Sequence, residues 1–141
     1  MRLDECQAAI LSVKLKHLDA WTKQRQEIAF WYYEALNGVG DLMLPQLHPE
    51  ATHVYHLYVV RTRKRNELQE YLQKNDIGTL IHYPIPPHLQ DAYKHLQLKK
   101  GDFPLAEEIA DTCLSLPLWP GMEPGHIGHI AALIKKFYIG N

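Results

Sequence analysis

Two histidines and a tyrosine on a proline-rich stretch, residues 78–89, are the side chains best suited to bind a substrate. The stretch opens with Thr-Leu-Ile after a glycine, which predicts a buried strand. Prolines follow, and a proline can neither donate a ladder hydrogen bond nor continue a helix, so the strand must stop there. His82, Tyr83 and His88 are therefore presented on a stiff arm. The alternative interpretation is a proline-rich turn on which the histidines have no function.

The other histidines and serines do not form a recognisable site. His53 and His56 are three residues apart, which places them on opposite faces of a strand and disfavours a shared metal ion. His126 and His129 would share one face of a helix, but two ligands do not complete a metal site. Ser115 has no base that the sequence can pair with it. This chemistry predicts a domain that contributes to a site completed by another part of a protein.

A long helical arm, residues 3–37, is predicted at the start of the chain. Two apolar stripes at helical spacing run through it, but they do not join through residues 14–17, so we expect a bend or a break there. Asn37-Gly38 can supply the left-handed cap that ends the arm. An arm of this length would more naturally cross between two bodies than belong to a self-contained domain.

The body of the fold, residues 41–141, is predicted to be a small three- or four-stranded sheet packed with helices, so the fold class is α+β. Residues 54–60 are β-branched and aromatic and predict the central strand. A connection of about 18 residues leads from it to the strand at 78–81, which suits a crossover helix. A short strand at 114–116 precedes a terminal amphipathic helix. With the arm, these elements make a single domain, residues 1–141.

Composition indicates an ordinary soluble globular protein. The formal net charge is −1, with 46% hydrophobic and 22% charged residues, so no basic excess suggests binding to nucleic acid or to a membrane. The basic run at 61–65 is interpreted as a solvated turn before a helix rather than as an RNA-binding patch. No apolar segment reaches membrane length and no signal peptide is recognisable, so we expect a cytoplasmic protein. Cys6 and Cys113 are expected to be buried, reduced thiols on helices.

Several ordered motifs resemble the DegT/DnrJ/EryC1/StrS family, the pyridoxal-phosphate-dependent sugar aminotransferases. Residues 2–10 are similar to the segment that opens the C-terminal small domain of that family, and residues 53–60 resemble its central strand. Residues 78–90 are similar to its best-marked C-terminal motif. Residues 102–107 and 114–120 continue the resemblance in the same order. The resemblance covers essentially all 141 residues, and it implies the C-terminal domain of such an enzyme.

The resemblance also implies what this chain lacks. Family members are longer, and their large N-terminal domain carries the Schiff-base lysine and most of the pyridoxal phosphate (PLP) site. We therefore expect that the chain alone has no catalytic residue, binds no metal and no cofactor, and is inactive, although its full-length parent uses PLP. In that parent, His82, Tyr83 and His88 would contact the nucleotide-sugar substrate, and Arg2 would lie at the domain junction.

The activity implied for the parent is amino transfer from glutamate or glutamine to a keto-sugar nucleotide. A PLP-dependent sugar dehydratase of the same family is an alternative, because the residue that distinguishes the two reactions lies outside this chain. A reading of a different class is a binding or interaction module without catalysis. The helical arm carries Trp21, Trp31, Tyr32 and Tyr33, and this surface, if it is not covered, predicts self-association as a homodimer or a larger species.

Overall fold

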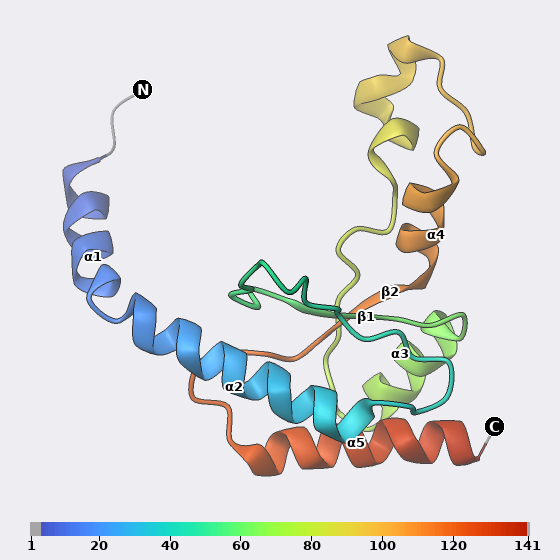
Figure 1. Cartoon of the computed structure of the whole chain (residues 1–141). Helices are drawn as coiled ribbons and strands as arrows, with labels where there is room; N and C mark the ends of the chain where they lie inside the picture. The colour runs from blue at the N-terminus through green and yellow to red at the C-terminus, as the bar shows by residue number, and fades with distance from the viewer. Residues whose placement is uncertain (1–3, 141) are drawn as a thin grey trace.

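The computed structural model describes residues 4–140 and shows a packed body from which two segments extend (Figure 1). Three helices form most of the body: α2 (Leu18–Leu36), α3 (Arg65–Lys74) and α5 (Pro124–Ile139). They pack with two short strands, β1 (Tyr58–Arg61) and β2 (Cys113–Leu116). Helix α1 (Glu5–Leu15) leads away from the body at one side.

The second extending segment, residues 84–112, rises from the opposite side of the body, and we call it the projection (Figure 1). It contains two short 3-10 helices and one α-helix: η1 (Pro87–Leu89), η2 (Asp91–Leu96) and α4 (Pro104–Thr112). Pro104 occupies the first turn of α4, where its missing N–H is not needed. The projection joins the body where α4 ends and β2 begins.

The predicted break in the helical arm is confirmed. Helix α1 ends at Leu15 and α2 begins at Leu18. The carboxylate of Asp4 caps α1 by accepting a hydrogen bond from the N–H of Gln7, at 3.1 Å. No residue of α1 is buried, whereas the second half of α2 buries one face against α5. The arm therefore belongs to the body only in its second half.

The core lies between the helices and one face of the sheet. Tyr32 of α2 stacks on Tyr58 of β1 with ring centroids 4.9 Å apart, and its hydroxyl donates to the carbonyl of Pro117 at 2.9 Å. Burial raises the pKa of the Tyr32 phenol above its ordinary value, so it stays neutral. Around this pair lie fully buried aliphatic side chains, including Leu72 of α3 and Ile134 of α5. Each such side chain stabilises the fold by about 1.5–3 kcal/mol relative to exposure.

The sheet is smaller than the predicted three or four strands. Strands β1 and β2 pair antiparallel, with Tyr58 opposite Leu116. Two further segments join through single antiparallel bridges, Met43 to Arg61 and Leu80 to Ser115. The ladder beside Met43 cannot extend through Pro45, which has no N–H to donate. Four segments therefore lie side by side, but two of them join only through single bridges.

The predicted central strand also begins later than expected, at Tyr58 instead of residue 54. Tyr55 has a positive φ of 47°, and its N–H donates to Nδ1 of His53 at 2.8 Å. This local turn excludes residues 53–57 from the ladder. The chain from β1 through α3 to Leu80 does form the predicted crossover, since both β1 and the Leu80 segment run antiparallel to β2.

The prediction of buried thiols on helices is half right for each cysteine. Cys113 is buried, but it opens β2 and does not lie on a helix, while Cys6 is exposed on α1. No residue of α1 is buried, and its Cys6 thiol is left exposed. Among residues 4–140, no helix combines the length and apolar character that a bilayer crossing requires.

Candidate functional site

The segment 78–83 lies along the outer edge of β2. The N–H of Ser115 donates to the carbonyl of Leu80 at 2.8 Å, and the N–H of Leu80 donates back at 3.3 Å. Leu80 is 65% exposed, so the expected buried strand is instead an edge segment with one bridge. Side chains alternate along β2, so Leu114 and Leu116 face the core and Ser115 faces the other side. The sheet therefore presents Ser115 to the segment that carries the predicted site residues.

His82 is held to β2 by two contacts. Its ring Nδ1 lies 2.9 Å from Oγ of Ser115. Its backbone carbonyl accepts a hydrogen bond from Sγ of Cys113 at 3.9 Å. The His82 ring is half-buried and lines a small pocket of about 180 Å³, to which His56 also contributes. Sequence patterns do not indicate the Ser115 contact, because the two residues are 33 positions apart.

Tyr83 points away from the body. Its side chain is among the most exposed of the large aromatic groups, at 72%. Its ring lies nearly perpendicular to the His82 ring, with an interplanar angle of 79° and centroids 5.5 Å apart. Tyr83 and His82 therefore form one group at the start of the proline-rich stretch, with a phenol hydroxyl and an imidazole able to bind a ligand.

His88 lies in a different environment, inside the projection. Its Nε2 is 3.0 Å from Oε1 of Glu107, and the N–H of Gly101 donates to the same oxygen at 2.7 Å. The Gly101 N–H, together with His88, lowers the pKa of the Glu107 carboxyl. The His88 ring also packs on Phe103 with centroids 5.0 Å apart. His88 thus holds the projection together and does not join His82 and Tyr83. The predicted junction residue, Arg2, lies outside the described residues.

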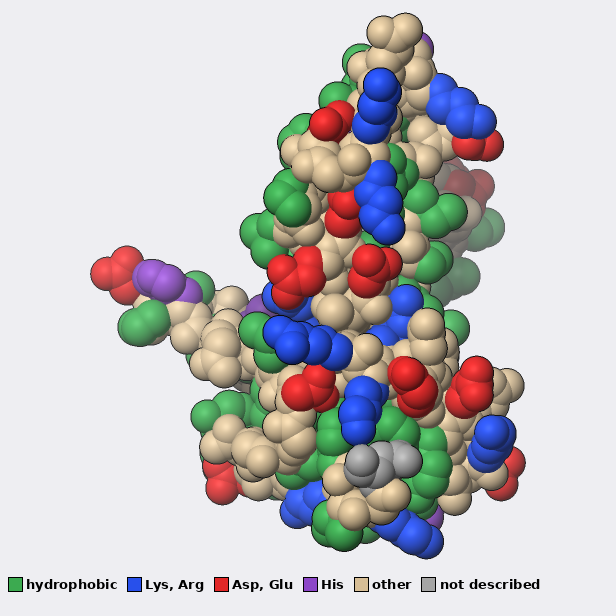
Figure 2. All heavy atoms as spheres, turned by 90° about the vertical axis from the view of Figure 1, so that its right-hand side faces the viewer, with side chains coloured by type: hydrophobic (Ala, Val, Ile, Leu, Met, Phe, Trp, Pro, Cys, Tyr) green, Lys and Arg blue, Asp and Glu red, His purple; other side chains and the backbone are tan. Residues whose placement is uncertain are grey.

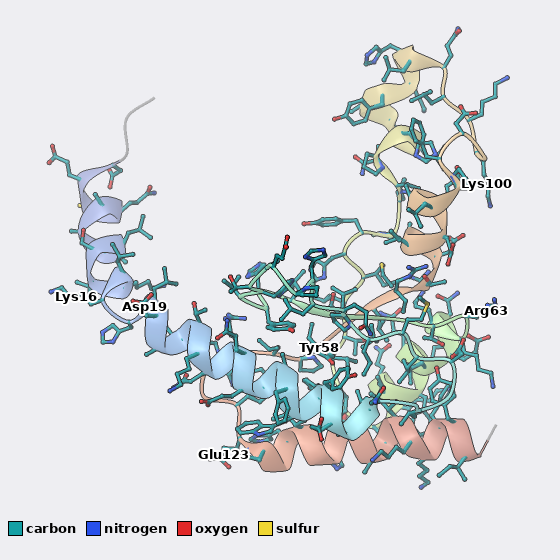
Figure 3. The ribbon with its side chains drawn as sticks, in the orientation of Figure 1. Lys16, Asp19, Tyr58, Arg63, Lys100 and Glu123 are labelled. Carbon is teal, nitrogen blue, oxygen red and sulfur yellow. The ribbon has the colours of Figure 1, made fainter. Side chains whose placement is uncertain are left out.

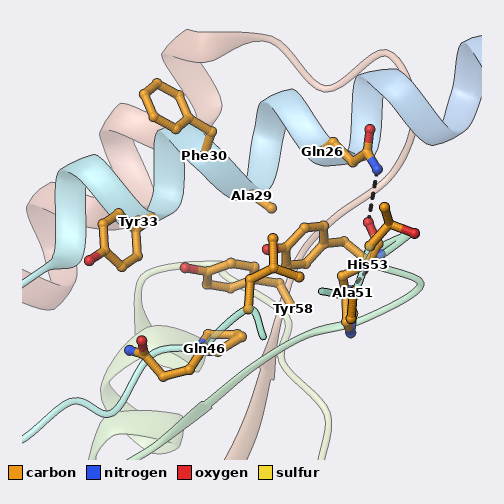
Figure 4. Close-up of a pocket in the computed structure, with 12 residues that line it drawn as sticks. Gln26, Ala29, Phe30, Tyr33, Gln46, Ala51, His53 and Tyr58 are labelled. Carbon is orange, nitrogen blue, oxygen red and sulfur yellow. Dashed lines mark hydrogen bonds between the residues drawn. The ribbon is translucent and has the colours of Figure 1, made fainter. Parts of the chain in front are cut away.

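A larger pocket of about 470 Å³ lies between α2 and the loop at 45–55 (Figure 4). One wall is fixed by Gln26, whose side-chain amide donates to the carbonyl of His53 at 3.0 Å. Tyr33 and Tyr58 also line it. The Tyr58 hydroxyl is buried without a hydrogen-bond partner among the described residues, and burial raises the pKa of this phenol. None of the residues predicted as a site lines this pocket, and its only sequence signal is the cluster of aromatic residues at 53–58.

The described residues do not fit the covalent site of PLP. A Schiff-base lysine needs a desolvated pocket that stabilises its neutral amine. Every lysine in the described part of the chain is exposed, and none lines the pockets above. Figure 3 shows two of them, Lys16 at the end of α1 and Lys100 on the projection, both away from the body. Within residues 4–140, no group of three or more His, Cys, Asp or Glu side chains is arranged to hold a metal ion.

Two of the four basic residues in the run at 61–65, Arg61 and Arg65, bond within the fold, while Arg63 and Lys64 are exposed. The guanidinium of Arg61 pairs with Glu108 and also donates to the hydroxyl of Thr112. Arg65 donates to the carbonyls of Ala110 and Cys113. Figure 2 shows acidic and basic side chains interspersed over the projection and the body below it. These contacts favour the interpretation of the run as a structural turn.

Comparison with known proteins agrees with the resemblance. A profile of the DegT/DnrJ/EryC1/StrS aminotransferase family matches residues 1–135. The chain is 45% identical over 134 residues to the erythromycin biosynthesis sensory transduction protein EryC1 of Saccharopolyspora erythraea, covering 95% of this chain and 37% of that protein. It is 42% identical over 136 residues to the dTDP-3-amino-3,6-dideoxy-alpha-D-galactopyranose transaminase of Aneurinibacillus thermoaerophilus, covering 96% and 37%.

A solved structure gives the same result for the fold. The crystal structure of S. venezuelae DesV in complex with a ketimine intermediate matches with a TM-score of 0.94 at 39% identity, over 97% of this chain and 37% of that one. The chain thus spans about 37% of the length of these relatives. Because the profile match extends over nearly all of its residues, the chain belongs to the DegT/DnrJ/EryC1/StrS aminotransferase family.

Proposed function

We propose that this chain is the C-terminal domain of a PLP-dependent nucleotide-sugar aminotransferase and forms one wall of its substrate site. The observation that carries the proposal is the match to a sugar-nucleotide transaminase over 96% of this chain but 37% of that protein. The exposure of every described lysine supports the further proposal that the Schiff-base lysine lies elsewhere in the parent. The chain alone is then inactive.

The exposed apolar surface of α1 supports a second body in the parent. Ile10, Leu11, Val13 and Leu15 are all more than half exposed, and no residue of the helix is buried. Such a surface is normally covered by another domain or another copy of the chain. We propose that the large PLP-binding domain and a homodimeric partner cover it. Light scattering of the isolated chain should detect a dimer or a larger species, and a monomer at high concentration would contradict this.

His82 and Tyr83 are the substrate contacts that we propose. The Tyr83 hydroxyl and the His82 ring can each donate a hydrogen bond to an oxygen of the sugar or of the diphosphate. The prolines that follow restrict the backbone, so less conformational entropy is lost when the ligand binds. His88 is not assigned a substrate contact, since Glu107 occupies its Nε2. Glutamate or glutamine is the proposed amino donor.

A chimera tests the function directly. This chain would replace the matched part of the Aneurinibacillus thermoaerophilus transaminase, and conversion of bound PLP to its amino form would be followed by absorbance after addition of the amino donor. We expect turnover of the sugar nucleotide by the chimera. Tyr83→Phe should lower turnover and leave cofactor absorbance intact, whereas Tyr93→Phe on the projection should change neither. A folded, PLP-loaded chimera without turnover, or full turnover by Tyr83→Phe, would contradict the respective assignment.

The absence of the Schiff-base lysine has its own test. The isolated chain would be mixed with PLP, reduced with borohydride and analysed by peptide mass spectrometry. We expect no lysine to be labelled stoichiometrically. A phosphopyridoxyl group on one specific lysine would disprove the proposal that the chain lacks the nucleophile. The identity of the Schiff-base residue in the parent, lysine or histidine, would separate the aminotransferase from the dehydratase alternative.

A further inference from the structure

Ser115 is a buried hydroxyl whose position is fixed by the sheet. Its backbone exchanges two hydrogen bonds with Leu80 on one side, and it lies opposite Val59 of β1 on the other. The residue is 6% exposed. Its Oγ is 2.9 Å from Nδ1 of His82, and it has no other hydrogen-bond partner among the described residues. The contact therefore joins a strand residue that is paired on both sides to one of the proposed substrate contacts.

The direction of this hydrogen bond follows from the surroundings of Ser115. If Nδ1 of His82 carried the proton, it would donate to Oγ, and the hydroxyl proton of Ser115 would have no protein acceptor among the described residues. Its one alternative would be solvent in the small pocket that both side chains line. Leaving a buried donor unpaired is unfavourable, and folded proteins avoid it. If the Ser115 hydroxyl donates to an unprotonated Nδ1, both groups are satisfied. The neutral ring then carries its proton on Nε2.

We propose that Ser115 is a positioning residue that sets the tautomer and the orientation of His82, so that Nε2–H is offered to the ligand as a hydrogen-bond donor. A neutral donor suits an oxygen acceptor such as a sugar hydroxyl, a carbonyl or a phosphate oxygen. The role of this donor in substrate binding rests on the function proposed above. The tautomer itself does not, because it depends only on contacts within this chain.

Ser115 is not assigned the role of a nucleophile. In serine hydrolases the histidine accepts the serine proton at one nitrogen while a carboxylate holds the other nitrogen. Among the described residues, no carboxylate contacts the His82 ring, and the Ser115 hydroxyl is buried beneath it. The arrangement can orient the ring but lacks the acid that a catalytic triad requires. A second contact, from Sγ of Cys113 to the His82 carbonyl, holds the backbone of the same residue.

The tautomer can be measured by NMR on the isolated chain. Long-range 1H–15N correlations distinguish a protonated from an unprotonated ring nitrogen, and spectra at a pH about two units above the usual histidine pKa of roughly 6.5 report the neutral ring. We expect His82 to carry its proton on Nε2. Ser115→Ala should give a mixture of tautomers, and Ser115→Thr, which keeps the hydroxyl, should restore the Nε2–H form. A proton on Nδ1 in the unmodified chain would overturn the proposal, even if Ser115→Ala fails to fold.

Kinetics of the chimera test the consequence for binding. Ser115→Ala should reduce kcat/KM by about three- to tenfold, the loss typical of one misdirected hydrogen bond, and Ser115→Thr should recover most of it. An unchanged kcat/KM in Ser115→Ala, together with an altered tautomer, would show that His82 does not bind the substrate through Nε2. Inactivity of the chimera before any substitution would count against the proposed function and would leave the NMR result on the tautomer valid.

Discussion

The body and the projection of this chain are stabilised in different ways. In the body, aliphatic and aromatic side chains from α2, α3, α5 and both strands fill one core. In the projection, Leu96, Phe103 and Leu105 are about half exposed or more, and the buried groups include a polar pair, His88 and Glu107. The body can thus fold by burial of apolar surface, whereas the projection depends on a few directed contacts. A segment of this kind is suited to complete a surface of another domain.

The largest effect should come from a cavity in the body. Leu72→Ala removes a side chain that is fully buried in α3 and should lower the free energy of unfolding by about 2–5 kcal/mol. The matched change in the projection, Leu105→Ala, removes a side chain that is 64% exposed. It should change the free energy of unfolding by less than about 0.5 kcal/mol. Chemical denaturation of both variants gives the two values. Equal losses would show that the two regions share one core.

A smaller effect is expected where the first loop of the body meets α5. Gly40 and Gly38 both have positive φ, 56° and 75°, so alanine at either position costs about 1 kcal/mol or more in the backbone. A Cβ at Gly40 would lie 2.1 Å from Cδ1 of Tyr138, while a Cβ at Gly38 would meet nothing within 4 Å. Because of this clash, Gly40→Ala should lower the free energy of unfolding by about 1–3 kcal/mol more than Gly38→Ala does. Thermal and denaturant unfolding should rank the two variants in this order.

A polar cluster at the edge of the body should contribute about 1 kcal/mol. The hydroxyl of Tyr138 lies 2.7 Å from both Oγ1 of Thr62 and Oδ1 of Asp41. Burial favours the neutral form of Asp41, but the hydrogen bonds from Thr62, Tyr138 and the N–H of Arg63 outweigh it and lower its pKa.

Tyr138→Phe should therefore lower the free energy of unfolding by about 1 kcal/mol at neutral pH. Because the pKa of Asp41 is lowered in the folded state, the ionised carboxylate stabilises the fold above the ordinary carboxyl pKa. This stabilisation is lost as the pH falls through the lowered pKa. The difference between wild type and Tyr138→Phe should shrink over that range. Tyr33→Phe, at a partly exposed tyrosine with no such cluster, is the control, and a similar loss there would weaken the assignment.

The smallest effect on global stability should come from acid acting on the projection. The pKa of Glu107 is lowered by the Gly101 N–H and by His88, so its stabilising contribution is present above the ordinary carboxyl pKa and is lost as the pH falls. Hydrogen exchange at the Gly101 amide should be faster in Glu107→Ala than in the wild type at neutral pH, and the ratio should approach one in acid.

The matched control in the projection is Asp91→Ala, which removes an exposed carboxylate paired with Lys94 and should leave hydrogen exchange at the Gly101 amide unchanged. Amides of β1 should exchange at the same rate in all three proteins, because the body does not depend on the Glu107 contact. Faster exchange at Val60 in Glu107→Ala would show that the projection and the body open as one unit.

The sequence predicted those parts of the fold that depend on neighbouring residues. The break between α1 and α2, the crossover through α3, strand β2 and the terminal helix α5 follow from apolar periodicity and from Gly and Pro positions, which act over a few residues. The same short-range signals predicted more strand residues than the structure contains. Residues 54–57 have strand-forming side chains, but the turn at Tyr55 keeps them out of the ladder, and Pro45 has no N–H to extend the bridge at Met43.

His82, Tyr83 and His88 were predicted as substrate contacts from residue types and spacing, and they stay predictions. The structure places His82 beside Tyr83, whereas His88 pairs with Glu107, 19 positions away. The Ser115 contact was missed because a serine shows its partner only when two distant segments lie side by side.

The sequence by itself therefore determined the family and the order of helices and strands, and it predicted residues for ligand binding, since these depend on side-chain type and short-range spacing. Only the tertiary structure decided which of those side chains act together. The antiparallel packing of residues 78–83 against β2 brings Ser115 beneath His82, and the fold of the projection takes His88 out of the group. Hydrogen-bond partners depend on distances of about 3 Å between atoms, and chain folding alone sets those distances.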